Sequence, residues 1–142
     1  MPELLNASQY TSLTVALRGF ERNLREAALW LSGSRPSGTL YHARLNMSPE
    51  RWSAALSLIA EALEAIAQLA DALGLEAADE DLGRKIVANM SIDWADLGDV
   101  SSARLSGYGA VDPRLGELLD PYVERLAQLA LSIASLAGEK PT

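Results

Sequence analysis

Apolar residues recur every three or four positions in four long segments of the chain, a spacing that places them on one face of an α-helix. In the first segment the stripe begins at Tyr10 and continues to Leu31, while most charged residues fall on other faces. Asn6 precedes the segment and Gln9 follows three residues later, a pair typical of the capping box at a helix N-terminus. The pattern therefore predicts an amphipathic helix that begins after Asn6 and ends before Gly33.

The second segment has the clearest helix start in the sequence. Ser48 can cap the free backbone N–H groups, and Pro49 suits the first helical position because an N–H there would have no helical partner. The apolar stripe runs from Trp52 to Leu73 without a polar interruption, and Gly74 follows it. We therefore predict a second amphipathic helix that ends at Gly74.

The third segment, at about residues 79–105, has a less regular stripe. If the segment is one helix, Asp93, Ser101 and Arg104 project into the same sector as its apolar residues. This predicted helix therefore places polar groups where the other helices carry aliphatic side chains.

The fourth segment contains two sites that resemble a helix start, Asp112-Pro113 and Asp120-Pro121. Apolar residues on both sides of Pro121 share one helical face, and Pro121 itself falls on the opposite face. A continuous helix tolerates proline best on its solvent side, at the cost of a hydrogen bond and a bend. We therefore predict one helix over residues 113–137, kinked near Asp120, with a short helix followed by a long one as the alternative.

These patterns together indicate an all-α fold, since no segment shows the alternation of a β-strand. Four helices of this length suit a four-helix bundle, whose default topology is up-down-up-down. The short links at residues 74–78 and 106–112 favour antiparallel neighbours. The link at residues 34–47 has fourteen residues and can follow a whole helix, so a parallel first pair stays open. Loops of this length are often functional.

Composition and charge narrow the class of protein. The chain has 142 residues, of which 49% are hydrophobic, and we expect one domain over residues 1–142. The acidic net charge of -7 disfavours nucleic acid and anionic lipid as partners. No uninterrupted apolar run reaches the ~20 residues of a membrane span, and the first residues lack a signal-peptide pattern. We therefore expect a cytoplasmic protein with no membrane partner.

Metal-dependent chemistry finds little support in the sequence. There is no cysteine, and His42 is the single histidine, so no Glu-x-x-His motif of a di-iron bundle is present. Asp93, Asp96 and Asp99 rotate progressively around a helix and do not share one face. Asn89, Asp93 and Asp96 could present oxygens together, but the first two helices keep their acids off the core side. We predict no metal site and no cofactor.

Asp93 and Arg104 are the strongest candidates for a binding site, because a charge within an apolar sector needs a partner or water. Eleven residues separate them, about 16 Å along a helix, so they cannot pair directly. Either they lie at the wet margin of a wide sector, or they form the polar floor of a pocket near the long loop. The candidate ligand-binding residues are Asp93, Trp94, Arg104, Tyr108, Tyr41 and His42.

The preferred functional hypothesis is a non-enzymatic helical module that associates with itself or with another protein. No catalytic motif is present, and several apolar residues lie outside the main stripes. These residues are Leu29, Trp30, Leu58, Ile92 and Leu131. They predict a homodimer, because apolar patches on a small bundle commonly mark an interface. The alternative is a small-molecule-binding or enzymatic bundle with its pocket at the candidate residues.

Overall fold

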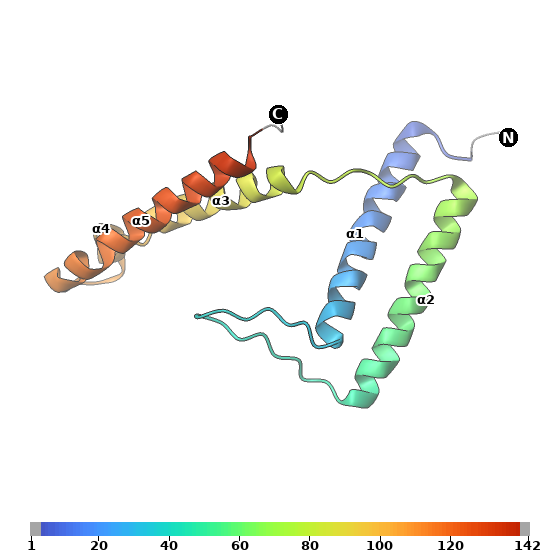
Figure 1. Ribbon diagram of the computed structural model, residues 1–142, viewed down its shortest axis with the longest axis horizontal. Helices are drawn as coiled ribbons and strands as arrows, with labels where there is room; N and C mark the ends of the chain where they lie inside the picture. Colours follow the sequence, from blue (N-terminus) through green and yellow to red (C-terminus); the bar gives the residue numbers. More distant parts are fainter. Residues whose placement is uncertain (1–3, 140–142) are drawn as a thin grey trace. The chain divides into compact units, whose positions relative to one another are not determined.

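The computed structural model describes residues 4–139, and its regular structure is helical (Figure 1). The helices are α1 Ala7–Leu31, α2 Pro49–Leu73, α3 Leu82–Gly98, α4 Ser102–Leu105, the 3-10 helix η1 Ser106–Tyr108 and α5 Pro113–Ala137. The all-α class is confirmed. Within residues 4–139 there are five α-helices rather than four, and a four-helix bundle is not confirmed. The chain divides into two compact units, Met1–Ala77 and Ala78–Thr142.

The first unit is an antiparallel hairpin of α1 and α2, which lie side by side in Figure 1. The hydroxyl of Tyr10, near the start of α1, accepts a hydrogen bond of 3.0 Å from the backbone N–H of Glu76, just after α2. This contact brings the beginning of α1 to the end of α2. The first two helices are therefore antiparallel, and the parallel alternative is excluded.

The helix ends of this unit follow from local sequence. Asn6 and Gln9 form the predicted capping box, with reciprocal side-chain to backbone hydrogen bonds of 2.8 and 2.9 Å. Ser48 caps α2 through a hydrogen bond of 3.3 Å from the N–H of Arg51. Gly74 ends α2 with a left-handed backbone at φ 66°, a conformation that glycine adopts without a steric penalty.

The predicted extent of the third helix is wrong, because the helix is interrupted between Gly98 and Ser102. Ser101 is extended and cannot continue a helix. The backbone N–H and the hydroxyl of Ser102 both donate to the carboxylate of Asp120 on α5, at 2.8 and 2.6 Å. These hydrogen bonds hold the first residue of α4 against α5.

α5 is continuous from Pro113 to Ala137, which confirms the single-helix interpretation. Asp112 caps it by accepting a hydrogen bond of 2.9 Å from the N–H of Arg114. Pro121 lies inside the helix and is exposed, as the phase of the apolar residues predicts.

α3 and α5 form the hairpin of the second unit. Their backbones approach so closely that a Cβ on Gly83, at the start of α3, would lie 2.7 Å from the carbonyl oxygen of Ala137, at the end of α5. The pair is therefore antiparallel, as the sequence predicts, but residues 99–112 with α4 and η1 join the two helices instead of the short link at residues 106–112. Val123 and Ala130 are buried on the side of α5 that meets α3.

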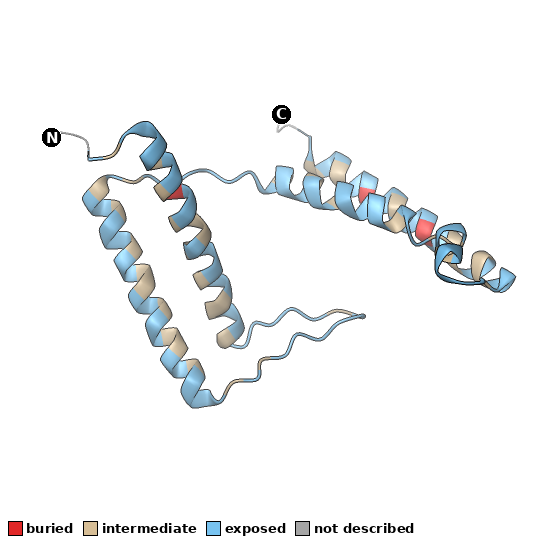
Figure 2. Cartoon of the chain, turned by 180° about the vertical axis from the view of Figure 1, so that it is seen from behind, coloured by how far each residue is buried: buried red, intermediate tan, exposed pale blue. Residues whose placement is uncertain are grey.

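Each hairpin is a single layer of two helices with little buried surface of its own. Figure 2 shows that most of each helix is exposed, with half-buried residues along the sides that meet. In the described part of the chain the buried residues are Thr14, Val123 and Ala130. A two-helix layer has no second layer to cover its apolar side. Each hairpin therefore leaves an apolar face uncovered.

α2 is also long and apolar enough to cross a membrane, judged by length and composition alone. Its most apolar 18-residue window has a mean hydropathy of 1.4. This is weak support for a membrane span, because the core helix of a soluble protein passes the same test. The expectation that the protein has no membrane partner stays a prediction.

Candidate functional site

An apolar groove of about 600 Å3 lies between α3 and α5. The α3 side is formed by Met90, Asp93, Asp96 and Leu97, with Val100 just beyond the helix. The α5 side is formed by Leu126, Leu129, Ala130 and Ile133. The groove therefore combines aliphatic walls from both helices with two carboxylates from one of them.

The spacing of apolar residues on α5 explains why this groove exists. Val123 and Ala130, seven residues apart, face α3 and are buried. Leu126 and Ile133 each follow three residues later, which rotates them about 60° around the helix from the buried pair. α5 is therefore apolar over a wider arc than its contact with α3 covers, and the uncovered part lines the groove.

The groove is open to solvent, and its apolar walls are poorly covered. Leu126, Leu129 and Ile133 are each exposed, and Val100 is exposed at the end of the α3 side. Burial of apolar surface is worth about 25 cal/mol per Å2, so these side chains favour any partner that removes them from water. The groove is thus the best-defined apolar docking surface in the second unit.

The carboxylates give one side of the groove a negative character. Asp93 and Asp96 are one helical turn apart and exposed. Within the part of the chain that the structure describes, neither has an ion-pair partner. Residues 86–103 contain no lysine or arginine, although they include three aspartates. Arg84 and Lys85 lie at the start of α3, but no lysine or arginine is among the residues that line the groove. A cationic group placed in the groove would therefore meet no positive charge in its lining.

The sequence-predicted site residues of the second unit are only partly brought together. Asp93 lies in the groove, whereas Trp94, Arg104 and Tyr108 are not among the residues that line it. Trp94 is 46% exposed, and Tyr108, in η1, is 91% exposed. Arg104 was placed by extending the phase of one helix past Gly98, and the break before α4 removes that phase relation. Their proposed role in ligand binding stays a prediction.

Tyr41 and His42 belong to the first unit, in the segment between α1 and α2. Residues 34–47, hereafter the arm, form a narrow antiparallel loop that extends from the α1–α2 hairpin (Figure 1). Ser37 pairs with His42 through an isolated β-bridge, and the N–H of Gly38 donates to the carbonyl of Tyr41 at 3.0 Å. At the tip, Leu40 is 94% exposed and Tyr41 is 58% exposed. The arm therefore has ordered structure but presents apolar side chains to water.

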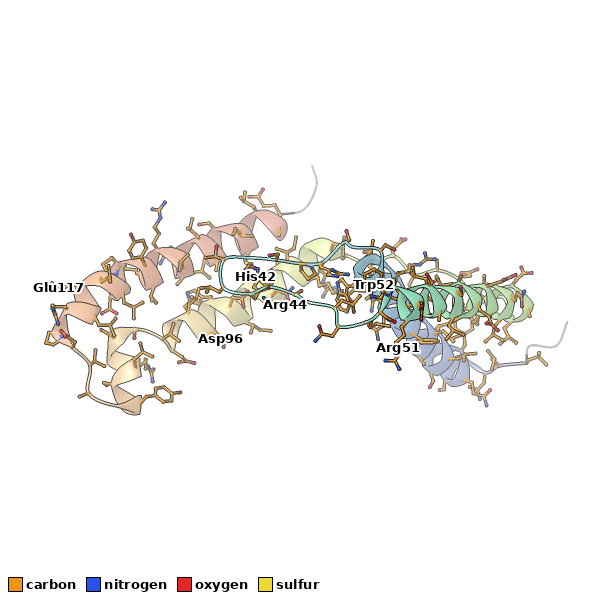
Figure 3. The ribbon with its side chains drawn as sticks, turned by 90° about the horizontal axis from the view of Figure 1, so that it is seen from below. His42, Arg44, Arg51, Trp52, Asp96 and Glu117 are labelled. Atoms are coloured by element: carbon orange, nitrogen blue, oxygen red, sulfur yellow. The ribbon has the colours of Figure 1, made fainter. Side chains whose placement is uncertain are left out.

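A side-chain contact joins the beginning of the arm to α2. The guanidinium of Arg35 lies 5.8 Å from the ring centroid of Trp52, within the range of a cation–π contact. The indole Nε1 of Trp52 is buried and has no hydrogen-bond partner among the described residues. Figure 3 shows His42 and Arg44 along the arm, with Arg51 and Trp52 at the start of α2. Arg44 is exposed and has no ion-pair partner within residues 4–139.

Two carboxylates outside the groove have structural roles. The side chain and backbone of Ser102 donate hydrogen bonds that lower the pKa of Asp120, and Arg114 lowers the pKa of Asp112 in the same way. Asp120 joins α4 to α5, and Asp112 caps α5. Within residues 4–139, no group of three or more His, Cys, Asp or Glu side chains is placed to hold a metal ion.

Comparison of the chain with protein-family models, with curated proteins and with solved structures found no match. The geometry of the groove and of the arm is therefore the basis for a functional proposal.

Proposed function

We propose that this protein is a non-enzymatic helical module that associates with a second copy of itself. The observation that carries this proposal is the uncovered apolar surface of both hairpins. Large apolar side chains are exposed on every long helix, among them Val15 on α1, Leu58 on α2, Ile92 on α3 and Leu126 on α5. An exposed apolar surface that is larger than a few isolated side chains commonly marks a protein interface.

α2 supports this proposal most directly because it is apolar on two sides. Ile59 and Ile66 belong to the stripe that turns toward α1, where they are partly covered. Leu58 and Leu69 lie on another side and are 65% and 38% exposed. Ala65 lies between these two leucines on the same face, and a small residue there lets another helix approach closely.

Two α1–α2 hairpins that pack through this second stripe would complete a four-helix bundle between copies. Antiparallel hairpins are the usual halves of such bundles, and a two-fold dimer is the commonest oligomer. A stable dimer of this type buries about 1,200–2,000 Å2 in total. Helices of 25 residues provide a face about 37 Å long, which is long enough for an interface of this size.

Analytical ultracentrifugation over a range of micromolar concentrations tests the proposal. We expect the parent protein to sediment with twice the 15.2 kDa mass of one chain. Replacement of Leu58 and Leu69 with serine should weaken the dimer at least about tenfold, because both leucines would lose their burial. Gln68→Ser is the matched control on the same helix and should leave the dimer unchanged. A parent protein that sediments as one chain throughout would refute self-association.

A second candidate function is the binding of a small cationic apolar molecule in the groove between α3 and α5. The observation in favour is that a groove of about 600 Å3 contains Asp93, and ligand pockets commonly have about 300–1,000 Å3. Thermal melts in the presence of arylalkylamines test this candidate. A ligand should raise the melting temperature of the parent but not of Asp93→Asn, and the absence of any shift would argue against it.

A further inference from the structure

We propose that the arm of one copy docks in the groove between α3 and α5 of a second copy. This inference rests on the self-association proposed above and specifies a contact that each copy makes with the other. Leu40 and Tyr41 at the tip of the arm would enter the apolar groove. Arg44 would lie beside the carboxylates of Asp93 and Asp96. Two equivalent contacts then form in a two-fold dimer.

The tip of the arm is well suited to enter an apolar site. Leu40 is almost fully exposed, although a side chain of its type is commonly buried. The hydrogen bond from Gly38 to the carbonyl of Tyr41, together with the β-bridge between Ser37 and His42, already orders the tip. Binding therefore requires less loss of conformational freedom than binding of an unstructured loop would.

Gly38 contributes to the shape of the tip. A Cβ at this position would lie 2.7 Å from Cε1 of the Tyr41 ring. The absence of a side chain therefore allows the ring to lie directly against the backbone of the turn. The tip places Tyr41, 58% exposed, next to the exposed Leu40.

The charges of the arm and the groove are complementary. Residues 27–49 include Arg35 and Arg44 but no aspartate or glutamate. Residues 86–103 include three aspartates but no lysine or arginine. The nine residues that line the groove include two aspartates and no lysine or arginine. This complementarity between the arm and the groove lining favours correct orientation and rapid association.

The same charges disfavour a dimer in which the groove of one copy packs against the groove of the other. Two α3–α5 faces packed around a two-fold axis would bring a second Asp93 and Asp96 to the same apolar surface. Carboxylates of like charge would then lose water without gaining a partner, which is costly. A cationic occupant such as the arm provides that partner.

Charge reversal tests the contact. Asp96→Arg changes the groove, and Arg44→Glu changes the arm. We expect each variant alone to dimerise about tenfold more weakly than the parent, because an attraction becomes a repulsion at both equivalent contacts. An equimolar mixture of the two variants should restore a heterodimer of parental affinity, since one contact then has both original charges and the other has both reversed charges.

Two matched variants control for the change in net charge. Glu117→Arg changes a residue of α5 that does not line the groove, and Arg51→Glu changes a residue of α2 beyond the end of the arm. Figure 3 labels both residues together with Arg44 and Asp96. Each control should dimerise as the parent does. A loss in the controls equal to that in the test variants would show a general charge effect and overturn the docked arm.

Crosslinking provides a measurement that does not depend on affinity. The chain has no cysteine, so introduced cysteines react without background. A copy with Leu40→Cys, mixed with a copy that carries Leu129→Cys, should give a heterodimer with a short bismaleimide. A mixture of the Leu40→Cys copy with a Glu117→Cys copy should give no crosslinked heterodimer. Equal yields from both mixtures would overturn the docking site.

The outcomes separate this inference from the proposed function. If the parent is a single chain in solution, both fail. If the parent is a dimer but Asp96→Arg and Arg44→Glu dimerise normally, self-association stands and the docked arm is refuted. If both variants weaken the dimer but their mixture does not restore it, the two residues do not face each other and the docked arm is again refuted.

Discussion

Asp120 on α5 accepts two hydrogen bonds from Ser102, one from the backbone N–H at 2.8 Å and one from the hydroxyl at 2.6 Å. The two residues are eighteen positions apart in the chain, and their contact determines where α4 begins. The same hydrogen bonds lower the pKa of Asp120, because they stabilise its charged form. This contact therefore makes part of the stability of the second unit depend on pH.

The pH dependence has a definite sign. A carboxyl with a lowered folded-state pKa stabilises the fold above its unfolded value of 3.8, and the contribution is lost as the pH falls through the lower folded value. Asp120→Asn removes the charge, so we expect a lower melting temperature at pH 7 and a smaller difference from the parent at pH 3. Glu124→Gln on the same helix is the control. Equal melting temperatures for Asp120→Asn and the parent at pH 7 would contradict the structural role of the contact.

The same contact shows where prediction from sequence reaches its limit. The caps at Asn6, Ser48 and Asp112 were predictable, because each acts on backbone N–H groups within three residues of itself. The break after Gly98 was not, because it depends on a side chain from another helix. The prediction that Arg104 shares the apolar face of α3 assumes one helix over residues 79–105. Arg104 lies in α4, so it does not belong to that face.

The sequence alone pointed to the α3 side of the groove but not to the α5 side. Asp93 stood out as a charge in an apolar stripe, and the structure places it in the groove. Leu126 and Ile133 belong to the apolar residues that follow Pro121 in the last helix. Helical phase alone does not show which part of the apolar arc of this helix α3 leaves uncovered. That information comes from the close approach at Gly83, where the register of the two helices is fixed.

Gly83 should therefore be intolerant of a side chain. Replacement of glycine by alanine within a helix normally stabilises it by about 0.5–1 kcal/mol. At Gly83 the added methyl group would lie 2.7 Å from the carbonyl oxygen of Ala137, so we expect Gly83→Ala to destabilise the protein. Gly19→Ala in α1 meets no atom within 4 Å and should stabilise it. Urea melts at one fixed protein concentration compare the two, and stabilisation by Gly83→Ala would refute the close approach.

Pro121 provides a test of the continuous last helix. Proline inside a helix lacks an N–H and strains the preceding turn, at a cost of about 3 kcal/mol relative to alanine in an unrelaxed helix. Because α5 continues through Pro121, Pro121→Ala should raise stability, by about 1–3 kcal/mol after local relaxation. Urea melts measure the change. If α5 instead ended before Pro121, alanine would gain nothing from helix formation and stability would remain within about 0.5 kcal/mol of the parent.

Gly38→Ala connects the shape of the arm to association. The added Cβ would lie 2.7 Å from the ring of Tyr41, so the ring must leave its position against the turn. The arm lies outside the packing of α1 on α2, so the melting temperature at a concentration where the protein is monomeric should not change. Dimerisation should weaken about five- to 150-fold, because one side chain in each of the two arms must reorder on binding, at about 0.5–1.5 kcal/mol each. Thr39→Ala, at the neighbouring position of the turn, is the control and should dimerise as the parent does. If Gly38→Ala dimerises with parental affinity in the ultracentrifuge, the position of Tyr41 has no part in the contact between copies.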